Sequence, residues 1–107
     1  MFTTKKRGKS RSVLNGVKLR SLVHGEKTHL CEFHLDKGAV IPNHKHPHEQ
    51  TGYQISGRMK FILGKKTFLV EPGSSWNIAG NVEHRVEVLE DSVVIEVFSP
   101  RREDYLD

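Results

Sequence analysis

Three histidines fall within residues 44–48, in the stretch HKHPH. Side chains at positions i and i+2 of an extended strand point to the same face, so His44 and His46 can aim two imidazoles at one point. Gln50 has the same parity and offers an amide oxygen, and His84 lies just before another strand-like stretch. These four side chains could together hold one divalent transition metal, such as Ni, Zn, Mn or Fe, which the ligand types alone do not distinguish.

The other histidines have less specific positions. His48 shares the parity of His46, so it is the alternative to Gln50 as a metal ligand; otherwise we expect it on the pocket wall, where it would contact a substrate. His24, His29 and His34 lie in strand-like stretches and are interpreted as ordinary surface or core residues. A histidine pair by itself is a weak signal, because short motifs recur by chance.

The segments that must position these residues have strand character. Short runs of β-branched and aromatic residues alternate with turn signals after residue 12. The predicted strands are Val17–Val23, His29–Leu35, Tyr53–Ser56, Arg58–Leu63, Thr67–Val70, Ser75–Ile78, Arg85–Leu89 and Val93–Phe98. Seven to nine strands at this spacing predict an antiparallel all-β sandwich or barrel, which can bring distant histidines together on its inner wall. The charged stretch Pro100–Asp107 is predicted to form a short helix or an arm across a partner subunit.

Length and composition narrow the class of protein. The 107 residues fit one domain, which is large enough to fold without disulfides or a structural metal. Cys31 is the only cysteine, and no apolar run approaches the roughly 20 residues of a membrane helix. No apolar stretch follows the basic N-terminal residues, so they do not resemble a secretory signal. We therefore expect a cytoplasmic protein without a membrane segment.

The net charge of +4 comes from the beginning of the chain. Five basic residues lie within residues 5–11, and the remaining 12 basic and 13 acidic residues nearly balance. We therefore divide the chain into a flexible basic tail, residues 1–12, and a β-barrel domain, residues 13–107. No nucleic-acid-binding motif accompanies the tail, so we expect no specific nucleic-acid partner.

The wider spacing around the histidines resembles the two motifs of the cupin family. The first corresponds to Gly38-x5-His44-x-His46-x3-Gln50-x6-Gly57, and the second to Gly73-x5-Ala79-x-Asn81-x2-His84. The resemblance implies a jelly-roll-like antiparallel β-barrel and makes His44, His46, Gln50 and His84 the metal ligands. The family usually has Glu at position 50, and often Pro and Gly at positions 79 and 81. With Gln50, the ligands are all neutral and leave the charge of the ion uncompensated, which favours an anionic ligand such as a small carboxylate.

Two stretches resemble the small single-domain cupins of the pectin degradation protein KdgF group. They are residues 44–57, HKHPHEQTGYQISG, and residues 97–106, VFSPRREDYL. The resemblance implies conversion of monomeric 4,5-unsaturated uronates into linear 4-deoxy-ketouronates. It also places the acidic, aromatic and arginine site residues of the group at Glu96, Phe98 and Arg102, with Glu where the group has Asp.

The residue types at these three positions suit such roles. Glu96 and Phe98 share one face of a predicted strand, so both can point into the barrel, where a carboxylate can act as a general acid or base. Arg102 could hold a substrate carboxylate in a bidentate pair and assist catalysis. The alternative is an ordinary role for each: Glu96 facing solvent, Phe98 in the core and Arg102 in a surface ion pair.

The leading hypothesis is a metal-dependent isomerase-like or lyase-like enzyme that acts on a small carboxylated sugar. The alternatives are a metal-dependent oxygenase, a non-catalytic sensor of a small acid, and a sugar isomerase or epimerase. Because exposed sheet edges in small open barrels are commonly covered by a partner, we also expect a homodimer.

Overall fold

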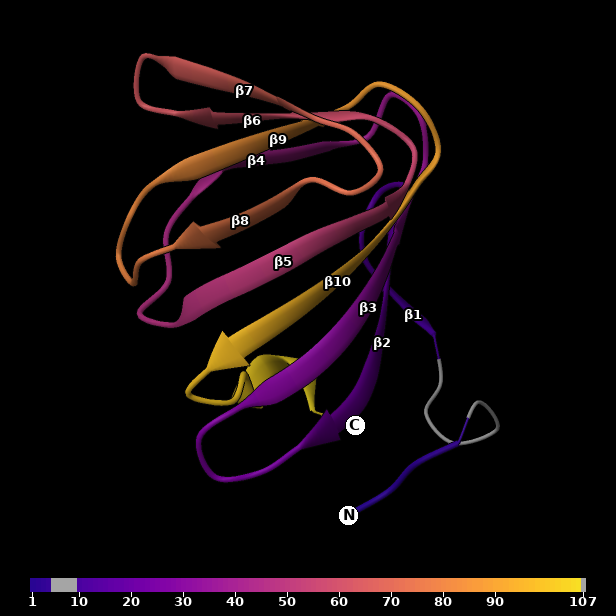
Figure 1. The fold of residues 1–107 in the computed structure, drawn as a ribbon, viewed down its shortest axis with the longest axis vertical. Coiled ribbons are helices and arrows are strands. Elements are labelled where there is room, and N and C mark those ends of the chain that lie inside the picture. The colour runs from indigo at the N-terminus through magenta and orange to yellow at the C-terminus, as the bar shows by residue number, and fades with distance from the viewer. Residues whose placement is uncertain (5–9, 107) are drawn as a thin grey trace.

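The computed structural model describes residues 1–4 and 10–106, which contain ten β-strands and one short 3-10 helix, η1 (Figure 1). Residues 5–9, which carry most of the charge of the predicted tail, lie outside the described part of the chain. The elements are β1 (Arg11–Leu14), β2 (Val17–His24), β3 (His29–Leu35), β4 (Val40–His44), β5 (Glu49–Ser56), β6 (Met59–Leu63), β7 (Lys66–Val70), β8 (Ser75–Ile78), β9 (His84–Val88), β10 (Ser92–Ser99) and η1 (Glu103–Tyr105). Within the described residues, no helix has the length and apolar character needed to cross a bilayer.

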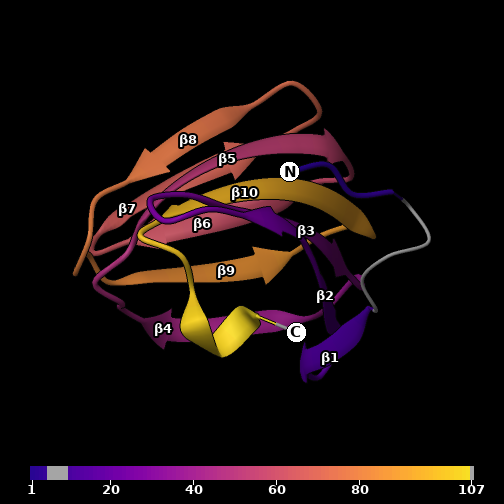
Figure 2. The ribbon, with the colours of Figure 1, turned by 90° about the horizontal axis from the view of Figure 1, so that it is seen from below.

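The strands form two antiparallel sheets that face each other (Figure 1, Figure 2). The six-stranded sheet has the order β1-β2-β3-β10-β5-β8, and the four-stranded sheet has the order β4-β9-β6-β7. This arrangement confirms the predicted all-β, jelly-roll-like fold, although the two sheets stay separate and do not join into one continuous barrel.

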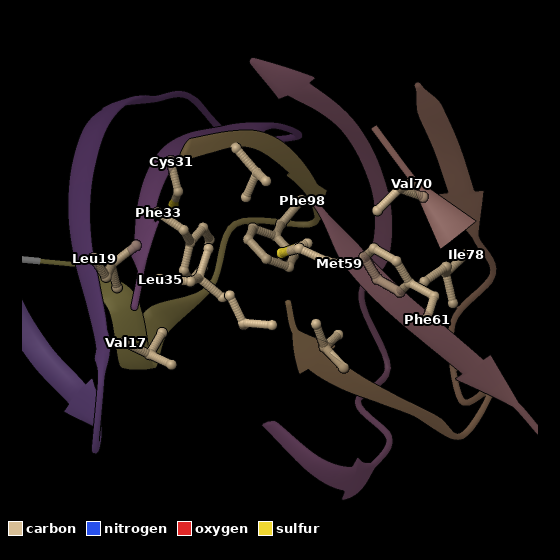
Figure 3. Close-up of a cluster of buried hydrophobic side chains, with 13 residues drawn as sticks. Val17, Leu19, Cys31, Phe33, Leu35, Met59, Phe61, Val70, Ile78 and Phe98 are labelled. Atoms are coloured by element: carbon tan, nitrogen blue, oxygen red, sulfur yellow. The ribbon is translucent and has the colours of Figure 1, made fainter. Parts of the chain in front are cut away.

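Burial alternates along the central strands, as expected for strands with one face toward a core. Every second residue of β3 and of β10 is buried, and this inward set includes Glu96 and Phe98. The two side chains therefore share one face, as the sequence predicts, and this face points inward. The buried apolar side chains gather between the two sheets (Figure 3).

Two strands lie outside the predicted set. Pro42 and Asn43 in β4 have poor strand propensity, and the pairing of β4 with β9 is irregular between Ile41 and His44, so the sequence lacks the usual alternation. β1 begins at Arg11, two residues before the predicted domain boundary, and pairs with β2. η1 lies within the C-terminal stretch for which a short helix or an arm was expected.

Candidate metal centre

Three histidines meet inside the protein, near the ends of β4 and β9. His44 ends β4, His84 begins β9, and the two are direct cross-strand partners. His46 follows two residues later, in the connection to β5. One ring nitrogen from each histidine lies within 4.8 Å of the other two, and both His46 and His84 are buried. Three imidazoles at this spacing form a site that suits a transition metal.

The same hydrogen-bonding device orients all three rings. The Nδ1 atoms of His44, His46 and His84 lie 2.8, 2.9 and 2.9 Å from backbone carbonyl oxygens two residues away. Because a carbonyl oxygen can only accept, each Nδ1 carries the hydrogen and donates it. Each Nε2 therefore keeps its lone pair free, which is the tautomer that metal binding needs.

Gln50 completes the donor set and provides a test of whether a metal fits. Its Oε1 lies 2.8 Å from Nε2 of His46, and both side chains are buried. Since this Nε2 has no hydrogen, the two atoms are acceptors that face each other, and a shared cation relieves their repulsion. Without a cation the amide can turn and donate an N–H to Nε2 instead. Three imidazole nitrogens and one amide oxygen thus fit a divalent transition metal.

Two loops hold the ligand segments together. The backbone N–H of Asn81 donates to the carbonyl oxygen of His46 at 2.7 Å, which ties the segment before His84 to the segment that follows β4. Asn81 has a φ of 63°, a conformation that Asn tolerates better than most residues. A Cβ at Gly80 would overlap the carbonyl oxygen of Pro47, so the close approach needs glycine. Asn81 thus stands where the second motif often has glycine, and its positive φ is one that glycine adopts readily.

Desolvation favours the neutral form of three histidine side chains near the cavity, namely His46, His84 and His48. It lowers the pKa of His46 to about 4, and the positive charge of Arg102 acts in the same direction. Burial also lowers the pKa of His84 and of His48. At neutral pH these three rings are therefore unprotonated, which is the state that can bind a metal.

Glu96 is the only carboxylate among the described residues that line the cavity next to the histidines. Its Oε1 accepts a hydrogen bond of 2.9 Å from the Trp76 indole Nε1, and its Oε2 has no hydrogen-bond partner among the described residues. Desolvation by burial raises the pKa of Glu96 to about 8, while Trp76 and the nearby Gln50 amide oppose the rise. Such a carboxyl group can both donate and accept a proton near neutral pH.

Several contacts fix Arg102 at the same cavity. Its Nε and Nη2 donate to the two carboxylate oxygens of Asp104 at 3.0 and 2.8 Å. Its guanidinium carbon lies 4.0 Å from the ring centre of Tyr105 and 4.9 Å from that of Phe98. Its backbone N–H donates to Nδ1 of His29 at 3.2 Å. The ion pair with Asp104 is the ordinary role that the sequence analysis gave as the alternative for Arg102. Arg102 is nevertheless buried and lines the cavity. The Nη1 side of its guanidinium takes no part in the pairing with Asp104.

The cavity has a volume of about 60 Å³ and lies between the two sheets. The structure brings seven of the predicted site residues to its wall: His44, His46, Gln50, His84, Glu96, Phe98 and Arg102. His48 is not among the lining residues; its ring centre lies 5.7 Å from that of His46, and its carbonyl oxygen accepts the Nδ1–H of His46. His48 therefore supports a ligand through its backbone.

Known proteins share both the sequence pattern and the fold. Residues 31–99 match the cupin domain family. The chain belongs to the cupin family. This cupin is 30% identical to the pectin degradation protein KdgF of Dickeya dadantii over 94 residues, which is 86% of each chain. It matches the structure of KdgF from Halomonas sp. with a TM-score of 0.91 and 30% identity, over 99% of this chain and 100% of that one.

A more distant match concerns the fold alone. An RmlC-like cupin from Shewanella frigidimarina is 24% identical, with a TM-score of 0.91 over 98% of this chain and 95% of that one.

Two side chains that touch the site of this cupin were interpreted from the sequence as ordinary residues outside it. His29 is fully buried, and its Nε2 lies 2.7 Å from the Ser21 hydroxyl while its Nδ1 accepts the Arg102 N–H. The alternation along β3 places His29 on the buried face, and this could have indicated its role, because a buried polar side chain needs hydrogen-bond partners. Trp76 contacts Glu96 from β8, and nothing in its local sequence indicates that contact.

Proposed function

We propose that this cupin is a metal-dependent enzyme that converts 4,5-unsaturated uronates into linear 4-deoxy-ketouronates. The observation that carries the proposal is the meeting of three kinds of group in one cavity: imidazoles with free Nε2 atoms, a buried carboxyl group with one unpartnered oxygen, and a buried guanidinium. Its similarity to two proteins named KdgF supports the same choice of substrate class.

Each group has a distinct task in this proposal. A divalent ion held by His44, His46, Gln50 and His84 would act as a Lewis acid that polarises a substrate oxygen. Arg102 binds the substrate carboxylate through the guanidinium edge that Asp104 does not occupy. The Phe98 ring, which packs against both Arg102 and His46, provides an apolar surface between the two.

The proton transfers fall to Glu96. Ring opening breaks the bond between C1 and the ring oxygen, moves the proton of the C1 hydroxyl to that oxygen, and leaves an aldehyde at C1 and an enol at C5. Conversion of the enol into a ketone removes the enol proton and adds one at C4. The net reaction is an isomerisation, so it needs no oxidant. Glu96 accepts and returns a proton through Oε2, the carboxylate oxygen that no described side chain engages.

The test is turnover of a 4,5-unsaturated uronate monomer by the metal-loaded protein, followed by loss of the alkene absorbance and by product analysis. We expect Glu96→Gln to lower kcat by about 10²-fold or more and Arg102→Ala to raise KM. Glu87→Gln and Arg85→Ala alter an ion pair on β9 away from the cavity and serve as matched controls. Full activity in both Glu96→Gln and Arg102→Ala would contradict the assignment.

The same assay separates the competing functions. Oxygen consumption that depends on substrate would favour the oxygenase, because three-histidine sites can hold Fe(II) with open positions. Binding of the uronate without turnover or oxygen consumption would favour the non-catalytic sensor. The homodimer and the cytoplasmic location stay predictions, and a mass of twice 12.2 kDa by light scattering would support the first.

A further inference from the structure

Three residues form a straight row across the six-stranded sheet. In the pairing of β10 with β5, Glu96 is the direct partner of Gly52, and in the pairing of β5 with β8, Gly52 is the direct partner of Trp76. Glu96 and Trp76 are therefore two strands apart, with glycine between them. The indole nevertheless donates a hydrogen bond of 2.9 Å to Oε1 of Glu96, so it must extend across the intervening strand.

Gly52 makes this reach possible. It is buried, and a Cβ built on it would overlap three atoms of the Trp76 indole, including Nε1. The ring thus occupies the space where a side chain of β5 would stand. The indole also packs against Phe61, whose ring centre lies 4.8 Å away. Any side chain at position 52 must displace the indole from Glu96.

We propose that Trp76, lying across Gly52, is a positioning residue that selects which oxygen of Glu96 faces the reacting atoms. The inference rests on the proposed function, because it assigns Glu96 the proton transfers. The indole N–H engages Oε1, and this leaves Oε2 as the only oxygen without a partner among the described residues. Without the indole N–H, Oε1 loses its hydrogen-bond donor, and the carboxyl group can rotate away from its productive geometry.

The location of Trp76 separates positioning from direct contact with substrate. Trp76 does not line the cavity beside the histidines; it lines a groove formed by β6, β7 and β8. Its hydrogen bond to Glu96 is therefore its polar link to the histidine cavity, beside its packing against Phe61. Removing that bond should affect the rate of the chemical step more than substrate binding, because the group that moves protons is misplaced while the carboxylate anchor at Arg102 is intact.

The contact can be tested without an activity assay, because Trp76 is the only tryptophan and gives a single indole N–H signal in ¹⁵N–¹H spectra. In the zinc-loaded full chain we expect this signal to be protected from solvent exchange and to move in Glu96→Gln. In Gly52→Ala it should move toward the position of free tryptophan and lose its protection. Phe68→Leu, on the outer side of the same groove, should leave it unchanged. An indole signal that is the same in wild type and Gly52→Ala would overturn the inference.

Kinetics of the uronate reaction test the role itself. We expect Trp76→Phe to lower kcat about tenfold or more with KM within about threefold, and Gly52→Ala to act in the same direction. In the Gly52→Ala/Trp76→Phe double variant, kcat should equal that of Trp76→Phe, because only one contact can be lost. An unchanged kcat in Trp76→Phe, beside an active wild type, overturns the inference and leaves the proposed function standing. A wild type that does not turn over the uronate overturns the proposed function, and the inference with it.

Discussion

Two cavities among the described residues contrast in size and in chemistry. The histidine cavity has a volume of about 60 Å³, whereas the β7–β8 groove, lined by residues of β6–β8 and by Ser74, has about 430 Å³. The smaller one brings together imidazole, amide, carboxyl and guanidinium groups, and the larger one has no titratable side chain among its lining residues. The site is therefore marked by buried polar groups that converge, and the volume of the cavity is a poor guide.

Strand position explains the difference. The histidine cavity lies where β4, β9, β5 and β10 send inward residues toward one another, so polar atoms from four strands converge there. The β7–β8 groove lies between the edge strands of the two sheets, where Phe68 and Leu69 are about half exposed. Trp76 lines the groove and donates to Glu96 in the cavity, so it lies between the two regions.

The pH dependence of stability should show how strongly the cavity constrains Glu96. Its pKa is about 8 in the folded chain and near 4.5 when unfolded, so ionisation opposes folding. Below pH 4.5 both states are protonated; between about 4.5 and 8 only the unfolded state releases the proton, and the free energy of unfolding falls as pH rises. In the metal-free proteins, we expect the free energy of unfolding of Glu96→Gln to rise relative to that of the wild type by a few kcal/mol between about pH 4.5 and pH 8. Urea unfolding at pH 5 and pH 8 measures the change, and a pH-independent difference would contradict it.

Replacing one phenylalanine in each region compares how much the packing of each region contributes to stability. Phe33 is 7% exposed beside the histidine cavity, and Phe68 is 48% exposed on the groove. We expect Phe33→Ala to lower the free energy of unfolding by about 3 kcal/mol or more and the Tm by roughly 12 °C. Phe68→Ala should cost less than about 1 kcal/mol. Similar losses in thermal unfolding would show that the groove contributes to the core.

The position of Arg102 depends on a hydrogen bond from its backbone N–H to the His29 ring, which a substitution at His29 removes. His29→Leu removes the acceptor of the Arg102 backbone N–H, and we expect KM for the unsaturated uronate to rise about tenfold with little change in kcat. His24→Leu is the matched control, since His24 is the cross-strand partner of His29 and no hydrogen bond links it to Arg102. The rise in KM should vanish in an Arg102→Ala background, and its persistence there would point to general destabilisation.

The smallest expected effect belongs to the groove. Leu69→Ser removes an exposed apolar side chain from its wall and touches none of the groups assigned to the reaction. We expect kcat/KM within about twofold of wild type and stability within about 0.5 kcal/mol. A large loss of activity in this variant would show that substrate uses the groove.

The sequence predicts the features that depend on local patterns. Alternation places Glu96 and Phe98 on one face of β10, which the structure turns inward, and the spacing between His44 and His46 lets both rings reach one point. β4 is absent from the predicted strands because Pro42 interrupts the alternation of apolar and polar residues that marks a strand.

The contacts that depend on register across several strands could not be predicted. Trp76 reaches Glu96 only because Gly52 stands between them in the row formed by β8, β5 and β10. His29 meets the Arg102 backbone only because the chain turns back after β10. Neither relation leaves a signal within a short stretch of sequence.

We propose above that His44, His46, Gln50 and His84 together bind one divalent metal in the histidine cavity. The most direct test of this proposal is elemental analysis of protein purified without added metal, beside the His44→Ala/His46→Ala variant and a His24→Ala/His34→Ala control. We expect close to one transition-metal ion per chain in the wild type and the control, and almost none in the cavity variant. Equal metal content in all three proteins, or no metal in the wild type after incubation with Ni, Zn, Mn and Fe(II) in turn, would show that these residues are not a metal site.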